Sequence, residues 1–144
     1  MTEFLPTFRA KKKDSDGYVE GFLYQDLVCY IPSDGIKSDT YLKAVDADSW
    51  YIMDSYSRNT QIDIDTASIH FPFMLDDNKN KMFASLQKSG KGGDILSVFN
   101  IEAQELQEGY CIFSSEEKGI KISNGSVEVD YDIFGSILVK GIMS

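Results

Sequence analysis

The chain has 144 residues, of which 42% are hydrophobic and 26% are charged. This length suits one domain or two very small units that share a core, and the apolar content is enough to offset the entropy lost on ordering the backbone. The 23 Asp and Glu residues outnumber the 14 Lys and Arg residues, which gives a formal net charge of -9. Because this charge opposes broad contact with phosphates or anionic lipids, we expect neither a nucleic acid nor a membrane as a partner.

The sequence indicates a protein that stays in the cytoplasm where it is made. It contains no uncharged apolar run long enough to cross a bilayer, and its first residues lack the basic and apolar regions of a signal peptide. Cys29 and Cys111 each lie in apolar, strand-like sequence, where a free cysteine behaves as a small buried hydrophobe. We therefore expect both thiols to be buried, and neither belongs to a C-x-x-C pair that would indicate zinc binding or redox activity.

The first 92 residues consist mainly of short strand-like runs separated by turns. Residues 22–31 are rich in aromatic and branched side chains and end at Pro32, which predicts a strand followed by a loop. Ile62 and Ile64 alternate with polar residues and should share one face of a strand. Further strands are therefore expected over residues 50–53, 61–65 and 69–74, the last at an edge or a strand end because Pro72 cannot donate to a ladder.

One short helix is predicted near residues 78–89. Met82, Phe83 and Leu86 follow a helical spacing there, an aspartate at position 76 or 77 can cap its start, and Gly90 can end it.

The last 52 residues are the most regular part of the sequence. Ser123-Asn124-Gly125-Ser126 favours a tight hairpin, because Asn-Gly accepts the positive φ angles of a type I′ turn. Closely spaced short strands of this kind are typical of a small barrel. Strands are predicted over residues 94–99, 110–113, 119–123, 127–131 and 136–142.

We therefore predict a mainly β protein in two parts: an N-terminal β-rich part (1–92) with a short helix near 78–89, and a C-terminal SH3-like small β-barrel (93–144). The N-terminal part holds 11 bases and 14 acids, whereas the C-terminal part holds 3 bases and 9 acids. The net charges are thus -3 and -6. The charge of the C-terminal part opposes nucleic-acid binding by a barrel there.

Five short motifs are spread over most of the chain: an F-R-A opening, a G-x-L element, an I-D-T element, a D-K-N-like stretch and a G-D-I element, here Phe8-Arg9-Ala10, Gly21-Phe22-Leu23, Ile64-Asp65-Thr66, Asp77-Asn78-Lys79 and Gly93-Asp94-Ile95. Together these motifs resemble the YopX-like family of bacteriophage and prophage proteins. The resemblance implies a small β-rich protein made from a phage or prophage inside a bacterium. It implies no catalytic residues. From the residue types alone, Gly93 and Asp94 are better explained by a tight turn than by chemistry.

Few residues form a pattern that indicates catalysis. The sole histidine, His70, lies beside aromatic residues without a metal-ligand spacing, so we expect it to be packed or on an edge strand. Two S-x-x-K strings lack the companion motifs of acyl-enzymes. The alternating pairs Asp63/Asp65 and Asp130/Asp132 are expected to be solvated.

Two further patterns resemble ion sites. Asp76, Asn78 and Asn80 imitate the first ligands of a calcium loop, but the glycine and the glutamate of that loop are missing, so a polar turn is the better interpretation. The basic cluster Lys11–Lys13 and the glycine-rich Ser89–Gly93 are candidate anion donors, although a solvated loop and a hinge explain them more simply.

From these observations we predict a non-enzymatic phage or prophage accessory protein without a cofactor or metal, which acts by binding an unidentified protein and forms a homo-oligomer. The nine Phe and eight Tyr residues support this prediction, because some of them should remain on the surface as interface anchors. Edge strands that pair between subunits would bury exposed backbone groups. The alternative is a small-ligand or nucleotide-binding module that uses the two candidate anion donors.

Overall fold

The computed structural model describes residues 5–30, 41–114, 116, 119–125, 128–130 and 134–144. Over these residues the protein is mainly β, as predicted, and the only helical segment is a short 3₁₀ turn, η3 (Ile64–Thr66). No described helix has the length and apolar content needed to pass through a bilayer.

The N-terminal half is a curled antiparallel sheet. Its strands are β1 (Thr7–Lys11), β2 (Tyr18–Gln25), β5 (Trp50–Met53) and β6 (Asn59–Gln61), paired in that order. The sheet curls back on itself, because Ile62 forms a bridge with Lys12 at the end of β1. This curvature encloses a small core of Ala10, Ile52, Ile62 and Ala67.

The C-terminal half is a second, more strongly curved set of antiparallel strands. It contains β9 (Asp94–Asn100), β10 (Glu105–Ser114), β11 (Gly119–Ser123), β12 (Glu128–Asp130) and β13 (Phe134–Ile142). β9 pairs with both β10 and β13, and β10 continues to β11 and β12. Its buried core consists of Ile69, Met74, Met82, Ala84, Leu96, Val98, Cys111, Ile120 and Ile122.

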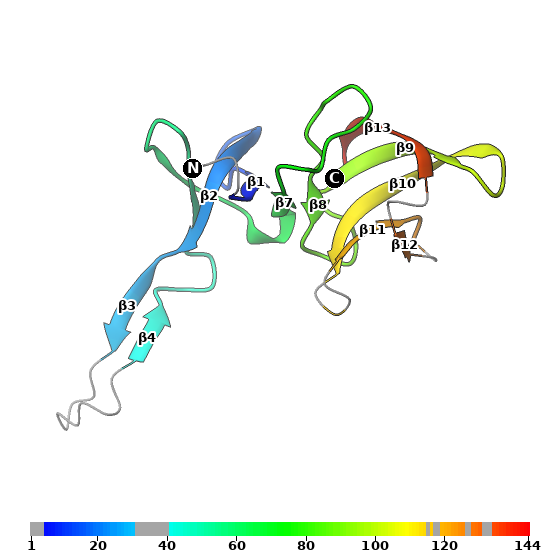
Figure 1. Cartoon of the computed structure of the whole chain (residues 1–144). Coiled ribbons are helices and arrows are strands. Elements are labelled where there is room, and N and C mark those ends of the chain that lie inside the picture. The colour runs from blue at the N-terminus through cyan, green and yellow to red at the C-terminus, as the bar shows by residue number, and fades with distance from the viewer. Residues whose placement is uncertain (1–4, 31–40, 115, 117–118, 126–127, 131–133) are drawn as a thin grey trace.

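Two very short strands join the halves into one eleven-stranded sheet (Figure 1). β7 (Ser68–His70) pairs with β1 on one side and with β8 (Ala84–Ser85) on the other. β8 in turn bridges to β10, where Ser85 lies opposite Ile112 in parallel register. Phe8 packs against both cores, so the halves share side-chain contacts as well as a ladder.

A two-stranded arm extends from the N-terminal half (Figure 1). β3 (Leu27–Tyr30) follows β2 after a break at Asp26 and pairs with β4 (Tyr41–Ala44). The predicted strand over residues 22–31 is therefore two strands as far as residue 30. The backbone of Asp26 holds the base of the arm, since its N–H donates to Ser49 and its carbonyl accepts from Val45.

The helix predicted near residues 78–89 is wrong. The amides of Asn78 and Asn80 donate to the Asp76 carboxylate, and that of Met82 donates to the Met74 carbonyl. The segment predicted as a helix instead forms a turn followed by β8, and both residues of β8, Ala84 and Ser85, are buried. The Asp76 carboxylate and the Met74 carbonyl thus replaced the carbonyls four residues earlier to which helical amides would donate.

Two other predictions about the fold need correction. The strand over residues 61–65 ends at Gln61, because the Asp63 side chain accepts the Asp65 amide and caps η3 instead of continuing a ladder. The SH3-like barrel is not confirmed, since no sheet of the described residues closes into a barrel. The division at residues 92 and 93 stays a prediction.

Glycines at 92 and 93 allow the two halves to approach closely. Gly92 has φ +83°, and a Cβ there would lie 1.9 Å from the backbone oxygen of Thr66. A Cβ on Gly93 would lie 2.5 Å from the Cys111 oxygen and 2.7 Å from the Ser85 nitrogen. Gly92 therefore takes the left-handed conformation, while Gly93 is needed for space alone.

We predict that Gly92→Ala destabilises the fold far more than Gly17→Ala. Both glycines have positive φ, but a Cβ at Gly17 meets nothing within 4 Å. Gly17→Ala should cost roughly 1–2 kcal/mol, the ordinary penalty of a left-handed L-residue. Gly92→Ala adds a backbone clash to that penalty. Urea unfolding of both variants measures the difference, and equal losses would show that the contact with Thr66 yields easily.

Candidate functional site

A buried ion pair links the two halves of the sheet. Arg9 on β1 donates from Nη2 to Oδ1 of Asp94 on β9 and to the carbonyl of Gly92, both at 2.8 Å. The other carboxylate oxygen, Oδ2, accepts the Phe83 amide at 2.8 Å. The Asp94 side chain is 2% exposed and the Arg9 side chain 9% exposed. The pair is therefore closed to solvent and to substrates.

Burial sets the electrostatics of this pair. It raises the pKa of Asp94 above its ordinary value, and the Arg9 guanidinium and the Phe83 amide oppose that rise. The guanidinium carbon lies 4.3 Å from the centre of the Phe83 ring, so the cation also packs on an aromatic face. Arg9 Nε has no hydrogen-bond partner among the described residues. These contacts give Asp94 a structural role, but through an ion pair with a distant strand and not through the tight turn predicted from its sequence context.

The calcium-like residues form a polar turn that covers the outer edge of β13. The Asp76 carboxylate accepts the amides of Asn78, Asn80 and Val139. Burial raises the pKa of Asp76, but these donors outweigh it and hold the pKa below its ordinary value of 3.8. Asp77 exchanges hydrogen bonds with Ile137 on the same edge. No cluster of three or more His, Cys, Asp or Glu side chains suited to a metal occurs in the described part of the chain.

His70 is buried on β7, inside the sheet, in agreement with the prediction of a packed histidine. Its Nδ1 lies 3.0 Å from the Met82 carbonyl, so Nδ1 carries the proton and donates it. The ring packs against Phe83 at a centroid distance of 5.3 Å. Burial lowers the pKa of His70 below 6.5, which keeps the ring neutral near pH 7.

The two candidate anion donors are engaged within the protein. In the Ser89–Gly93 loop, the amides of Gly90, Gly92 and Gly93 donate to the carbonyls of Gln87, Met143 and Gly90. A phosphate would need those amides free. Lys11, Lys12 and Lys13 line a shallow hollow together with Asp48 and Asp63, and Lys13 pairs with Asp48 at 3.0 Å. Acidic neighbours thus offset the basic cluster.

The remaining candidate residues also have structural environments. Ser85, the first residue of one S-x-x-K string, is buried and its hydroxyl donates to the Lys91 carbonyl. The other S-x-x-K string includes positions outside the described residues. Asp132, the second member of the Asp130/Asp132 pair, also lies outside them. Asp63 caps η3. None of these contacts joins a nucleophilic side chain to a general base.

The prediction of two buried cysteines holds for only one of them. Cys111 lies in the C-terminal core, where burial raises the pKa of its thiol well above the ordinary range. Cys29 is exposed, because β3 belongs to the arm and lies over neither core. The same apolar sequence context therefore occurs in a core strand and in a strand without a core.

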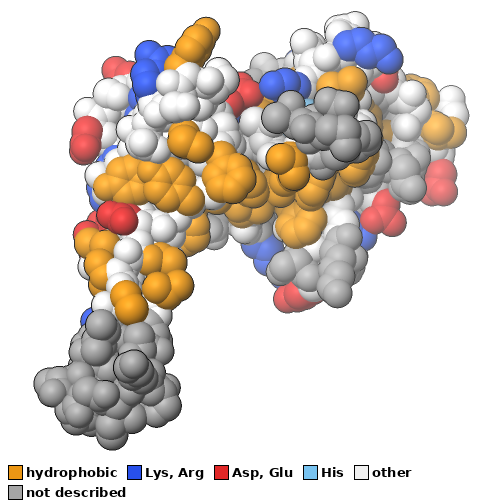
Figure 2. Space-filling model, turned by 60° about the vertical axis from the view of Figure 1, so that its left-hand side comes forward, with side chains coloured by type: hydrophobic (Ala, Val, Ile, Leu, Met, Phe, Trp, Pro, Cys, Tyr) orange, Lys and Arg blue, Asp and Glu red, His pale blue; other side chains and the backbone are white. Residues whose placement is uncertain are grey.

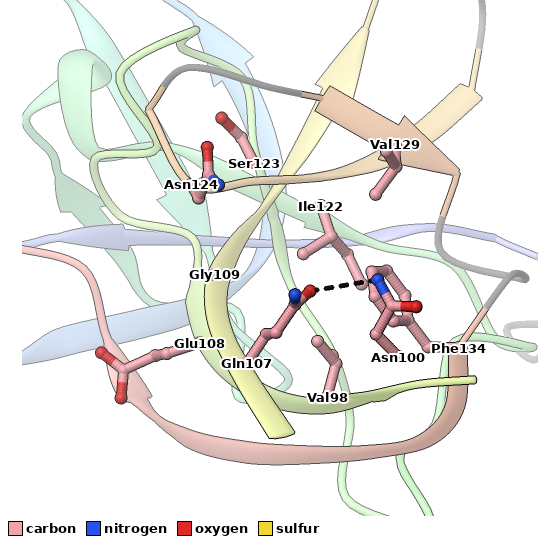
Figure 3. A pocket seen from close by; sticks show the side chains of 10 residues that line it. All are labelled: Val98, Asn100, Gln107, Glu108, Gly109, Ile122, Ser123, Asn124, Val129 and Phe134. Carbon is pink, nitrogen blue, oxygen red and sulfur yellow. Dashed lines mark hydrogen bonds between the residues drawn. The ribbon is translucent and has the colours of Figure 1, made fainter. Parts of the chain in front are cut away.

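An open hollow of about 470 Å³ lies on the C-terminal half (Figure 3). Val98, Ile122 and Val129 contribute apolar side chains, and Asn100 donates to Gln107 at 3.3 Å beside them. Its described lining includes one acid, Glu108, and no Lys or Arg. The hollow therefore suits a neutral polar group better than an anion.

An exposed apolar surface lies on the N-terminal half. In the register of β2 and β5, Phe22 opposes Met53 and Tyr24 opposes Tyr51, so these four side chains share the side of the sheet away from the core. Phe22 is 60% exposed, and the two tyrosine rings stack at 5.6 Å. We call these four residues the outer face. Tyr56, in the turn after β5, is 79% exposed.

Exposed apolar side chains are concentrated on the N-terminal half of the molecule. Figure 2 shows them extending from the arm onto the body. Of the large apolar residues that are exposed in the described chain, more than half lie between positions 22 and 56, namely Phe22, Leu27, Val28, Leu42, Val45, Met53 and Tyr56. Sequence patterns missed this surface, because an apolar strand over a core and one without a core have the same composition.

Comparison of the chain with protein-family models, curated proteins and solved structures gave no match. Evidence for its function therefore comes from these surfaces and contacts.

We predict that the Arg9–Asp94 pair is strongly coupled. Removing one partner leaves an uncompensated buried charge, so Arg9→Met or Asp94→Asn alone should cost about 3–5 kcal/mol. The double variant should cost clearly less than the sum of the two. Lys13→Met, which breaks the more exposed pair with Asp48, should cost less than about 1 kcal/mol. Urea unfolding of the wild type and these four variants tests this, and additive single losses would contradict the coupling.

We also predict that His70 makes stability depend on pH below about 6.5. There the unfolded chain binds a proton that the folded protein, with its lowered pKa, does not bind. Stability is then lost as pH falls from 6.5 towards the folded pKa, by at most about 1.4 kcal/mol at pH 5.5. His70→Gln keeps a donor and removes this titration. Urea unfolding at pH 7.5 and 5.5 should show a smaller loss for the variant, and equal losses would exclude the effect.

Proposed function

We propose that this chain is a non-enzymatic accessory protein of the YopX-like kind, made from a phage or prophage, which acts in the bacterial cytoplasm by binding other proteins and forms a homo-oligomer. The observation that carries the proposal is the outer face. A surface strand pair ordinarily places polar side chains towards solvent, whereas Phe22, Met53 and two stacked tyrosines occupy that side here. Exposed aromatic and methionine side chains are typical anchors of protein interfaces.

The charge around the outer face indicates the chemistry of its partner. Asp26 and Asp54 lie at its two ends, directly after β2 and β5, and Asp54 is already paired with Arg58 at 3.0 Å. With a net charge of -9, the chain attracts proteins whose binding patch has a basic rim. The partner should therefore have an apolar patch rimmed by Lys or Arg.

Contacts between motif residues support the proposed family. Arg9 of the F-R-A motif bonds to Asp94 of the G-D-I motif, although 85 positions separate them. Thr66 of the I-D-T motif accepts the Lys11 amide, next to F-R-A. A Cβ on Gly21 of the G-x-L motif would lie 2.1 Å from the Met53 oxygen. These motifs need no catalytic role, because their residues hold the fold together. The curved antiparallel strands of residues 93–144 support an SH3-like character for that half.

The environments of the ionisable groups support a non-enzymatic role. Asp94, Asp76 and His70 all have shifted pKa values, and each one bonds to groups that hold the fold together. Perturbed ionisable groups often mark active sites, but structural networks perturb them too. Here the hydrogen-bond partners are backbone amides, a backbone carbonyl and a buried guanidinium.

The hollow of Figure 3 favours a second candidate function, the binding of a small ligand. Its amide and apolar lining would suit a neutral polar molecule better than a nucleotide. The occupied amides of the glycine-rich loop give nucleotide binding no support.

We predict that the outer face retains a partner during affinity purification from the bacterium that expresses the protein. The tagged wild type is compared with Phe22→Ser/Met53→Ser and with Ile101→Ser/Leu106→Ser, a matched pair of exposed residues around the β9–β10 turn. The first variant should lose the partner by roughly tenfold or more, as expected when hot-spot residues are removed, and the second should retain it. Partner binding should weaken as salt rises.

Equal thermal unfolding midpoints would show that both variants are folded. A partner retained equally by both would contradict the role of the outer face, and a wild type that retains no protein above the tag-only control would contradict the proposed function. A thermal-shift screen with neutral sugars and nucleotides tests the alternative, because a ligand at a hundred times its Kd adds about 2.7 kcal/mol of stability.

A further inference from the structure

The arm presents an apolar side that its own chain leaves uncovered. In its antiparallel register, Leu27 opposes Ala44 and Cys29 opposes Leu42, so these four residues share one side of the two strands. We call them the arm face. Leu27 is 45% exposed and Leu42 is 68% exposed. Neither hydrophobic core includes a residue of the arm face.

The arm needs stabilisation from outside its own strands. An isolated two-stranded hairpin is marginally stable in water and usually requires a third strand or a covering layer. β3 and β4 pair only with each other in the described residues, so their outer edges present backbone groups that another chain can bind. The arm extends away from the body, where a second molecule can reach it (Figure 1).

Charge indicates which molecule covers the arm face. The sequence of the arm, residues 27–45, holds two acids, Asp34 and Asp39, and two bases, Lys37 and Lys43, so its net charge is zero, while the chain as a whole has a net charge of -9. Asp26 directly precedes β3, and Asp46 and Asp48 follow β4. Two copies of an acidic protein repel one another least where they meet through a region without net charge. The arm face also has no charged side chain that would require a complementary one on a different protein.

We propose that the arm face is covered by the arm face of a second copy of this chain, with the two arms antiparallel about a two-fold axis. A two-fold interface uses the same patch on both subunits, and an uncharged apolar patch is complementary to itself. Antiparallel arms place the two acidic bodies at opposite ends of the contact, which separates their charges. This inference rests on the proposed homo-oligomer and deepens it by naming the surface through which two copies meet, and it uses residues distinct from the outer face.

Cys29 provides a chemical probe of this geometry. Packed sheets lie about 10 Å apart, with their side chains meeting between them, so the two Cys29 thiols should come within reach of a short bis-maleimide. The only other cysteine, Cys111, is buried and has a raised pKa, so it should not react. The wild-type chain can therefore be used without replacing any residue.

The test combines light scattering with crosslinking of the full chain by bis-maleimidoethane. We expect the mass of two chains in solution and a covalent dimer on a denaturing gel. Cys29→Ser should abolish the crosslink and keep the mass of two chains. Leu42→Asp should weaken the dimer about tenfold or more, because it places a charge in the contact. Leu106→Asp, at a similarly exposed leucine of the β9–β10 hairpin, should leave the dimer intact.

The salt dependence of the dimer affinity distinguishes this contact from an attraction between opposite charges. Screening reduces the repulsion between two acidic copies, so the dimer should tighten as salt rises. A monomeric wild type would overturn the proposal, as would equal weakening by Leu42→Asp and Leu106→Asp. A dimer that crosslinks poorly but survives Leu42→Asp would also overturn it, because that result places the interface elsewhere.

The two proposals can fail separately. A monomer that still retains a foreign partner through the outer face would overturn the arm dimer and the proposed homo-oligomer, and would leave the binding of other proteins through the outer face standing. A dimer that retains no foreign partner would overturn only the binding role of the outer face. Phe22→Ser/Met53→Ser should therefore remain a dimer, and Leu42→Asp should still retain the partner. Loss of the partner in Leu42→Asp would show instead that a foreign protein covers the arm face.

Discussion

The Arg9–Asp94 ion pair is the interaction on which the rest of the structure depends. It joins β1 to β9 across 85 positions, inside a region that excludes water. A buried charge is tolerated only when it is paired and hydrogen-bonded, so each partner requires the other to be in place. The Gly92 carbonyl and the Phe83 amide complete the network. The loop before β9 and the segment before β8 are thereby held against the first strand.

The two halves depend on one another because their shared elements are too short to form alone. β8 has two residues and β7 has three, yet they connect the strands of both halves. Strands this short are held by their neighbours, and here the neighbours include the ion pair and the close approach of Gly92 to Thr66. A stable junction leaves the rest of the N-terminal half free to expose the outer face and the arm. The buried ionisable residues Arg9, Asp94 and His70 stabilise the fold, whereas the proposed binding role rests on the exposed apolar residues.

Sequence patterns predicted several strands well where branched and aromatic residues run between turn residues. Residues 50–53 and 119–123 are strands with the predicted bounds, and β9 and β13 lie close to theirs. The helix near residues 78–89 failed because its amides bond to acceptors other than the carbonyls four residues earlier. The amides of Asn78 and Asn80 bond to Asp76, and that of Phe83 bonds to Asp94. A helical spacing of Met82 and Leu86 contains no information about those acceptors.

The fold class follows from sequence patterns, because alternation, branched side chains and turn residues act over a few neighbouring positions. The packing of His70 was also predicted, whereas the tight turn predicted for Asp94 gives way to an ion pair with a residue 85 positions away. Which apolar strands have a core beneath them depends on the tertiary arrangement. Cys29 and Cys111 have similar sequence surroundings, yet one is exposed and the other buried. Burial depends on which distant strands cover a side chain, and local composition does not record that arrangement.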